Sequence, residues 1–198
     1  GLEGRQLKAG DEFGIKPFTR ETVHVCDYYG EGHNLFNTTL YNRGGRDCHE
    51  PLRVVLGDQA RYFTEKGIKT FGSKIYTLTM QCDRMGFRFD GPVIEHVDSA
   101  DIISDGAVFG SIQVPSDGNP IVLMADRQTT GGYTKIGAII TSDLPCLSQL
   151  PVGDGIRFDI VTINEAQDIY RTYMKRLDKR MQLAYEQSTY VFKVRNNI

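Results

Sequence analysis

The chain has 198 residues, a length that fits one domain or one domain with appended segments. Apolar residues make up 40% of it, which is enough to build a hydrophobic core. A formal net charge of −2 gives no sign of a basic nucleic-acid or membrane surface, and no apolar run approaches the roughly 18 residues of a membrane span.

The beginning of the chain is weakly patterned. Residues 4–15 look like the end of a sheet, and residues 21–50 are rich in Tyr, Asn and Gly, as loops are. We therefore treat residues 1–49 as an N-terminal segment that is distinct from the rest.

The middle of the chain alternates short apolar runs with turn residues, which is the pattern of a β-rich domain. Residues 74–83 and 86–91 each alternate apolar and polar side chains, which predicts two half-buried strands. Residues 155–163 alternate in the same way and predict a third.

A hairpin is predicted between these strands. Residues 116–119, with the sequence Ser-Asp-Gly-Asn, have strong turn chemistry and separate two apolar runs. The second run, residues 121–125, is continuously apolar, as expected of a strand buried on both faces. Many short strands with little helix between them favour a mainly β fold, a barrel or a sandwich.

One long amphipathic helix is predicted after the last of these strands. Apolar side chains recur at helical spacing from residue 165 to residue 185. Asn164 is expected to cap the helix, with Gln167 completing a capping box. We expect the apolar face to pack on the barrel rather than meet a partner, and residues 188–198 to form a tail strand.

Several common sites are missing from the sequence. It has no Walker loop and no Gly-x-Ser-x-Gly elbow, and Gly30 with Gly32 lacks the strand and helix of a nucleotide fingerprint. The four cysteines form no Cys-x-x-Cys pair, which favours reduced thiols in a cytoplasmic protein. Structural zinc favours tight ligand pairs, so the nearby His and Cys residues around 24–26 and 48–49 predict no metal site.

The stretch "ADRQTTGGYTKIG", residues 125–137, concentrates groups that bind carbonyl and carboxylate oxygens. Asp126 accepts hydrogen bonds, Arg127 offers a planar fork, and Gln128 both donates and accepts. The backbone amides of Gly131 and Gly132 are able to converge on an anion or a carbonyl oxygen. The alternative is a β-turn with an internal Asp–Arg ion pair.

Two other stretches repeat this chemistry. Asp83 and Arg84 place an acid beside a base in residues 82–92, and Gln113 places an amide before a Pro-containing turn. The alternatives are a twisted strand with a structural ion pair and an ordinary turn.

Residues 52–71, 82–92 and 110–137 together resemble the KipA family, also called allophanate hydrolase subunit 2 and known as the C-type subunit of bacterial 5-oxoprolinase. They are also similar to the carboxyltransferase domain of urea carboxylase. The resemblance runs from about residue 52 to residue 167. It implies cyclophilin-like β-barrels, two in tandem in the full protein, and a KipI-type partner subunit.

The chain departs from this family at both ends. Family members carry a further barrel before the segment that matches residues 1–15, so we expect either a fragment or a missing half on a separate chain. The expected organisation is a barrel remnant plus loop over 1–49, a cyclophilin-like barrel over 50–163, and a helix with tail strand over 164–198. Thr134 stands where the family commonly has Pro, which should alter loop rigidity more than chemistry.

The resemblance implies a subunit that helps to open 5-oxoproline to glutamate, with ATP bound by a partner subunit. The first alternative is a biotin-dependent carboxyltransferase acting on urea or a related amide, and the second is a non-enzymatic antagonist of a KipI-type kinase inhibitor. The predicted catalytic residues are Asp126, Arg127 and Gln128. The predicted substrate-binding residues are Thr129, Thr130, Gly131, Gly132, Tyr133, Gln113, Asp83 and Arg84.

Overall fold

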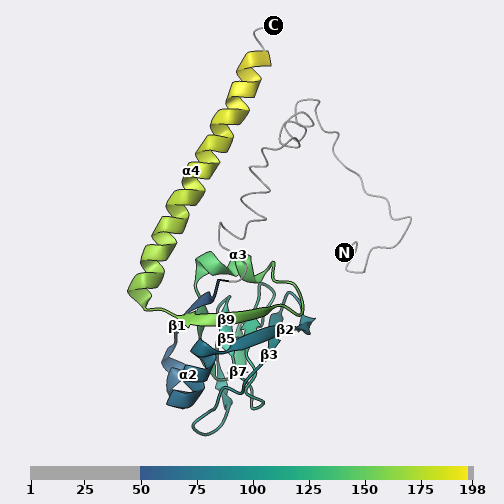
Figure 1. Ribbon diagram of the computed structural model, residues 1–198, viewed down its shortest axis with the longest axis vertical. Coiled ribbons are helices and arrows are strands. Elements are labelled where there is room, and N and C mark those ends of the chain that lie inside the picture. The colour runs from purple at the N-terminus through teal and green to yellow at the C-terminus, as the bar shows by residue number, and fades with distance from the viewer. Residues whose placement is uncertain (1–49, 196–198) are drawn as a thin grey trace, which may run out of the picture. The chain divides into compact units, whose positions relative to one another are not determined.

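Seven strands close into a β-barrel in the computed structural model, which describes residues 50–195, with side chains to residue 182 except 180 (Figure 1). Their order around the barrel is β1-β8-β5-β6-β3-β2-β9, and β9 returns parallel to β1 while the other pairs are antiparallel. The strands are β1 (Leu52–Leu56), β2 (Ile75–Cys82), β3 (Gly86–Asp90), β5 (Ser111–Gln113), β6 (Ile121–Leu123), β8 (Lys135–Ile139) and β9 (Gly155–Ile160). The predicted mainly β barrel with a C-terminal helix is confirmed.

Two further strands form a separate two-stranded sheet, which we call the ribbon. It consists of β4 (Asp101–Gly106) and β7 (Thr130–Tyr133), paired antiparallel. The sequence did not predict this ribbon, because neither strand shows a clear apolar alternation.

The helical segments are short until the end of the chain. They are η4 (Asp58–Tyr62), α2 (Glu65–Ser73), η5 (Thr141–Asp143), α3 (Leu144–Leu147) and α4 (Ile163–Arg195). Only α4 was predicted. The first turn of α2 is capped by Thr64, whose Oγ1 accepts a hydrogen bond from the Gly67 N–H at 2.9 Å.

Aromatic side chains fill the barrel core. Phe158 of β9 stacks on Phe71 of α2 with ring centroids 4.6 Å apart, and it also contacts the rings of Tyr76 and Phe89. All four side chains are buried. The contact between Phe71 and Phe158 places α2 against β9 and closes this part of the core.

The predicted alternation is confirmed in β2, with one exception. Tyr76 and Leu78 point into the core, but Met80 is 84% exposed. The pairing of β2 with β3 shifts register between Leu78 and Cys82, and such an irregularity changes the face on which side chains lie.

The predicted hairpin is also confirmed. Strands β5 and β6 pair antiparallel, and Gly118 in their connection has a φ of 77°, a conformation that favours glycine. Val122 is fully buried, and Ile121 is nearly so although it lies on the opposite face of β6.

The predicted cap of the long helix is wrong by two residues. Thr162 and Glu165 form the capping box: Thr162 Oγ1 accepts from the Glu165 N–H, and the Glu165 carboxylate accepts from the Thr162 N–H at 2.7 Å. A Thr–Glu pair spaced by three residues supplies both acceptors, so Asn164 and Gln167 are not needed.

The predicted tail strand is also incorrect where the chain is described, because α4 continues through residues 188–195. A lone strand leaves its backbone groups unpaired, whereas a helix satisfies them internally. The described part of α4 contacts η5 and β1, while its apolar side chains Tyr170 and Met181 are exposed. The expected packing on the barrel is therefore limited to η5 and β1.

Residues 1–49 and 196–198 lie outside the described residues, together with the predictions made for them. The proposed domain boundaries remain predictions. Among the described residues, no helix combines the length and apolar character of a membrane span.

Candidate functional site

A cavity of about 440 Å³ lies on the outer face of the barrel, with β7 of the ribbon contributing to its wall. Its barrel residues alternate with core residues such as Phe89, Ile112 and Val122, which places them on the outside of the strands. The lining residues are Met80, Gln81, Cys82, Asp83, Met85, Gly86, Arg88, Gln113, Ile121, Leu123, Gln128, Thr130 and Tyr133.

Five of the predicted site residues line this cavity. They are Gln128, Thr130, Tyr133, Gln113 and Asp83. The other six, Asp126, Arg127, Arg84, Thr129, Gly131 and Gly132, lie near these in sequence but are not among the described lining residues. Of the three residues predicted to be catalytic, only Gln128 is brought to the cavity, and the roles themselves remain predictions.

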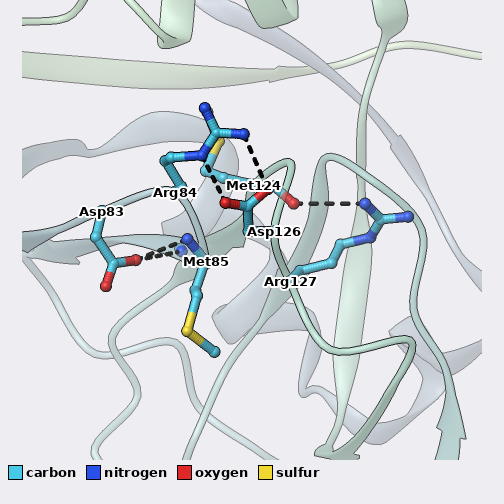
Figure 2. A network of polar contacts seen from close by, with 7 residues as sticks. Asp83, Arg84, Met85, Met124, Asp126 and Arg127 are labelled. Atoms are coloured by element: carbon cyan, nitrogen blue, oxygen red, sulfur yellow. Dashed lines mark hydrogen bonds and ion pairs between the residues drawn. The ribbon is translucent and has the colours of Figure 1, made fainter. Parts of the chain in front are cut away.

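Arg84 and Asp126 form an exposed ion pair outside the cavity (Figure 2). The Arg84 Nη2 donates to Asp126 Oδ1 at 3.0 Å, and this hydrogen bond lowers the pKa of Asp126 and raises that of Arg84. The Asp126 N–H also donates to the Arg84 carbonyl at 2.8 Å. The pair therefore ties the β2–β3 turn to the loop after β6, in agreement with the structural alternative for these two stretches.

The donors of Arg127 are already engaged. Its Nε donates to the carbonyl of Ala107 at 3.2 Å, and its Nη1 donates to the carbonyl of Met124 at 3.4 Å (Figure 2). The guanidinium also lies over the Phe109 ring, 5.9 Å from its centroid. Arg127 thus holds together the two loops that lead into β5 and β7.

Asp83 shapes the turn at one end of the cavity. Its Oδ1 accepts hydrogen bonds from the backbone N–H groups of Met85 at 2.7 Å and Gly86 at 3.1 Å (Figure 2). One oxygen is therefore committed to the turn, an arrangement typical of Asp in turns.

Gln113 is the most unusual residue of the lining. Its side chain is buried, and its Nε2 has no hydrogen-bond partner among the described residues. Leaving a buried donor unpaired costs roughly 1–3 kcal/mol, so this amide is held at a cost. Nε2 lies against Gly131, where a Cβ would come within 2.2 Å of it, so any larger residue at that point of the ribbon would displace the amide.

Polar contacts fix the ribbon to the barrel. Asp105 Oδ2 accepts a hydrogen bond from Gln59 Nε2 at 2.7 Å and lies 3.3 Å from Lys135 Nζ. Gln59 Oε1 in turn accepts from the Lys135 N–H at 2.8 Å. We call Gln59, Asp105 and Lys135 the ribbon clamp, and it determines where the β7 wall of the cavity stands.

Thr134 connects the end of β7 to a half-buried histidine. Its Oγ1 lies 3.0 Å from His96 Nε2, which is also 3.1 Å from the carbonyl of Val114. A carbonyl only accepts, so His96 carries a proton on Nε2. Thr134 is fully buried and lies outside the cavity lining, as expected of a residue that affects rigidity.

The sequence missed most of the apolar lining and one arginine. Arg88 lies on the outer face of β3 between two inward-pointing phenylalanines, a position that the alternation of residues 86–91 already indicated. The cavity contains no metal-binding set, and no group of three or more His, Cys, Asp or Glu side chains that could hold a metal occurs in residues 50–182 where side chains are described.

Residues 1–160 match the family described as the carboxyltransferase domain, subdomains A and B. The chain belongs to this family. It is 32% identical to the C-type 5-oxoprolinase subunit of Haemophilus influenzae over 190 residues, which are 95% of this chain and 56% of that protein. It is 34% identical to the C-type 5-oxoprolinase subunit of Escherichia coli K12 over 166 residues, 84% of this chain and 49% of that protein.

The predicted membership of the KipA family, with its 5-oxoprolinase subunits, is thereby confirmed. The chain spans about half the length of these relatives. Among solved structures, Kluyveromyces lactis urea amidolyase superposes with a TM-score of 0.63 at 20% identity, over 68% of this chain and 9% of that one. Urea carboxylase of the same yeast superposes equally well over 68% of this chain and 13% of its own, which shows a shared fold.

Proposed function

We propose that this chain provides an amide-binding site of an ATP-dependent 5-oxoprolinase, which opens 5-oxoproline to glutamate together with other subunits. The observation that carries the proposal is a cavity with two carboxamides, Gln113 and Gln128, on a chain that is 32–34% identical to subunits of that name. Both relatives are named as one subunit of a larger enzyme, which supports a partner; we propose a KipI-type subunit.

The chemistry of the lactam matches the cavity. A lactam presents one N–H donor and one carbonyl acceptor, which a carboxamide is able to pair with edge to edge. The apolar side chains of Ile121 and Leu123 offer a surface for the ring methylenes, and Tyr133 offers a ring face. In the reaction the C–N bond of the lactam breaks, water supplies the second oxygen of the new carboxylate, and the nitrogen becomes an amine.

ATP is assigned to a partner subunit. Arg88 and Asp83 are the charged residues of the lining, a poor match for a triphosphate that requires several donors. The role of this chain is then to hold and orient the lactam.

The test is reconstitution. The full protein is combined with its partner subunits, 5-oxoproline and ATP, and glutamate is measured. We expect glutamate only when this chain is present, and a large loss with Gln128→Ala but not with Gln167→Ala, an exposed glutamine on α4. Glutamate formation without this chain would refute the proposal.

The family description favours a second candidate, a biotin-dependent carboxyltransferase. Carboxybiotin would supply an activated carboxyl group there, and Gln113 and Gln128 are suited to hold its planar ureido ring or the acceptor amide. Carboxylation of urea that depends on added carboxybiotin, with no glutamate formed, would select this candidate. Binding of a KipI-type protein with neither turnover would instead select the non-enzymatic antagonist.

A further inference from the structure

The cavity contains a second polar anchor, Arg88, at a fixed place relative to Gln113. We propose that Arg88 binds the carboxylate of a cyclic amide whose amide group meets Gln113, so that the site selects lactams with a carboxylate beside the ring nitrogen. The identity of that ligand as 5-oxoproline rests on the proposed function, but the placement of Arg88 does not.

The strand register brings these residues into one row. Arg88 of β3 pairs with Ile121 of β6, and Ile121 pairs with Gln113 of β5. Neighbouring strands lie about 4.8 Å apart, which places the Cα atoms of Arg88 and Gln113 about 10 Å from each other. All three side chains line the cavity, with Ile121 between the two polar ones.

This row suits a small carboxylated ring. The two side chains reach toward each other from positions about 10 Å apart, leaving a space a few ångströms wide above Ile121. In 5-oxoproline the carboxylate is attached to the carbon next to the ring nitrogen, so amide and carboxylate lie at adjacent positions. The ring would rest on Ile121 with one polar group at each end.

Arg88 differs from the other arginines of the two motifs because its side chain is not engaged. Arg84 is paired with Asp126, and Arg127 bonds two backbone carbonyls. Within the described residues, Arg88 has no ion pair or side-chain hydrogen bond, and it is exposed. A planar guanidinium with free donors is the group best matched to a carboxylate, which it binds through two parallel hydrogen bonds.

A neighbouring cavity makes the position more distinctive. A second cavity of about 240 Å³ shares Met80, Gln81, Arg88 and Ile121 with the first, so Arg88 stands at their boundary. It is the only lysine or arginine among the described residues that line either cavity. An anion that enters from either side therefore meets the same guanidinium.

The experiment compares two ligands that differ by one group. Binding of 5-oxoproline and of pyrrolidin-2-one, the same lactam without the carboxylate, is measured by calorimetry on the full protein with its partner subunits. The variants are Arg88→Gln, Arg88→Lys and, as matched control, Arg157→Gln, an exposed arginine on β9 outside both cavities. Glutamate formation is followed on the same samples.

We expect Arg88→Gln to weaken binding of 5-oxoproline about tenfold or more, as the loss of a charge-assisted hydrogen bond does, and to leave pyrrolidin-2-one nearly unchanged. Arg88→Lys should recover part of the loss, and Arg157→Gln should change neither ligand. Equal weakening of both ligands, no weakening, or no binding of 5-oxoproline by the unmodified protein would each overturn the inference. Selective weakening without glutamate formation would instead support the role of Arg88 and refute the oxoprolinase proposal.

Discussion

At the scale of single residues, the two arginines of the motif loops illustrate how identical chemistry serves different ends. Arg84 and Arg127 are bonded within the protein, one to a carboxylate and one to two carbonyls. Gln113 is the reverse, a buried amide with an unused donor. Unsatisfied groups of this kind mark where a ligand is able to supply the missing partner.

Substitution of Gln113 by leucine separates stability from binding. Because leucine has a similar size and no unpaired donor, we expect the free energy of unfolding to stay the same or to rise by up to about 1–3 kcal/mol. Binding of 5-oxoproline should fall sharply. Urea unfolding and calorimetry measure the two effects, and a marked loss of stability would show that the amide has a structural partner instead.

His96 makes stability depend on pH. Burial is the larger influence and lowers the pKa of His96 below its ordinary value, although its contact with the Val114 carbonyl acts in the opposite direction. The folded state therefore resists a proton that the unfolded chain takes up near pH 6.5, so the contribution is present above about pH 6.5 and is lost as the pH falls toward the folded pKa.

We expect the free energy of unfolding to fall between about pH 7.5 and about pH 5.5, and to fall less in His96→Gln, which keeps an N–H donor but does not titrate. Denaturant unfolding at the two pH values measures this. The same pH dependence in both proteins would assign the effect to other groups.

At the scale of elements, the ribbon determines the shape of the cavity. Strand β7 supplies Thr130 and Tyr133 to the lining, while β4 is tied to the barrel through Asp105. The sequence motif "DRQTTGGY" therefore builds part of a wall whose position depends on residues far away in the chain.

Loss of the ribbon clamp should loosen that wall without unfolding the barrel. In Asp105→Ala we expect faster amide exchange in β7, unchanged exchange in β1 and β9, and weaker binding of 5-oxoproline. Hydrogen exchange read by mass spectrometry measures the first two. Asp101→Ala, on the same strand and also exposed, is the control, and an equal effect there would show that the clamp is not special.

At the scale of the whole molecule, the barrel core links strands that are far apart in the chain. Phe158 contacts Phe71, Tyr76 and Phe89, so its ring joins β9 to α2, β2 and β3. Removing it should affect the entire barrel at once.

We expect Phe158→Ala to lower the free energy of unfolding by about 3–5 kcal/mol, the usual cost of deleting a buried aromatic ring. Urea unfolding followed by circular dichroism measures this, with Tyr170→Ala on the exposed part of α4 as control. A loss of similar size in both variants would contradict the central place of Phe158.

The sequence by itself determined the local elements and the family. The alternation in β2, β3 and β9, the turn at Gly118 and the helical spacing of α4 are properties of short segments, and they predicted a mainly β barrel with a final helix. The motifs around residues 82–92 and 110–137 identified the relatives.

Only the tertiary structure decided which side chains meet. Asp126 and Gln128 are two residues apart, yet one is paired with Arg84 outside the cavity and the other lines it. Arg88 and Gln113 are 25 residues apart, yet they share a row through Ile121. The physical reason is that strand register and loop contacts are set by pairing between distant segments, and a local pattern carries no information about that pairing.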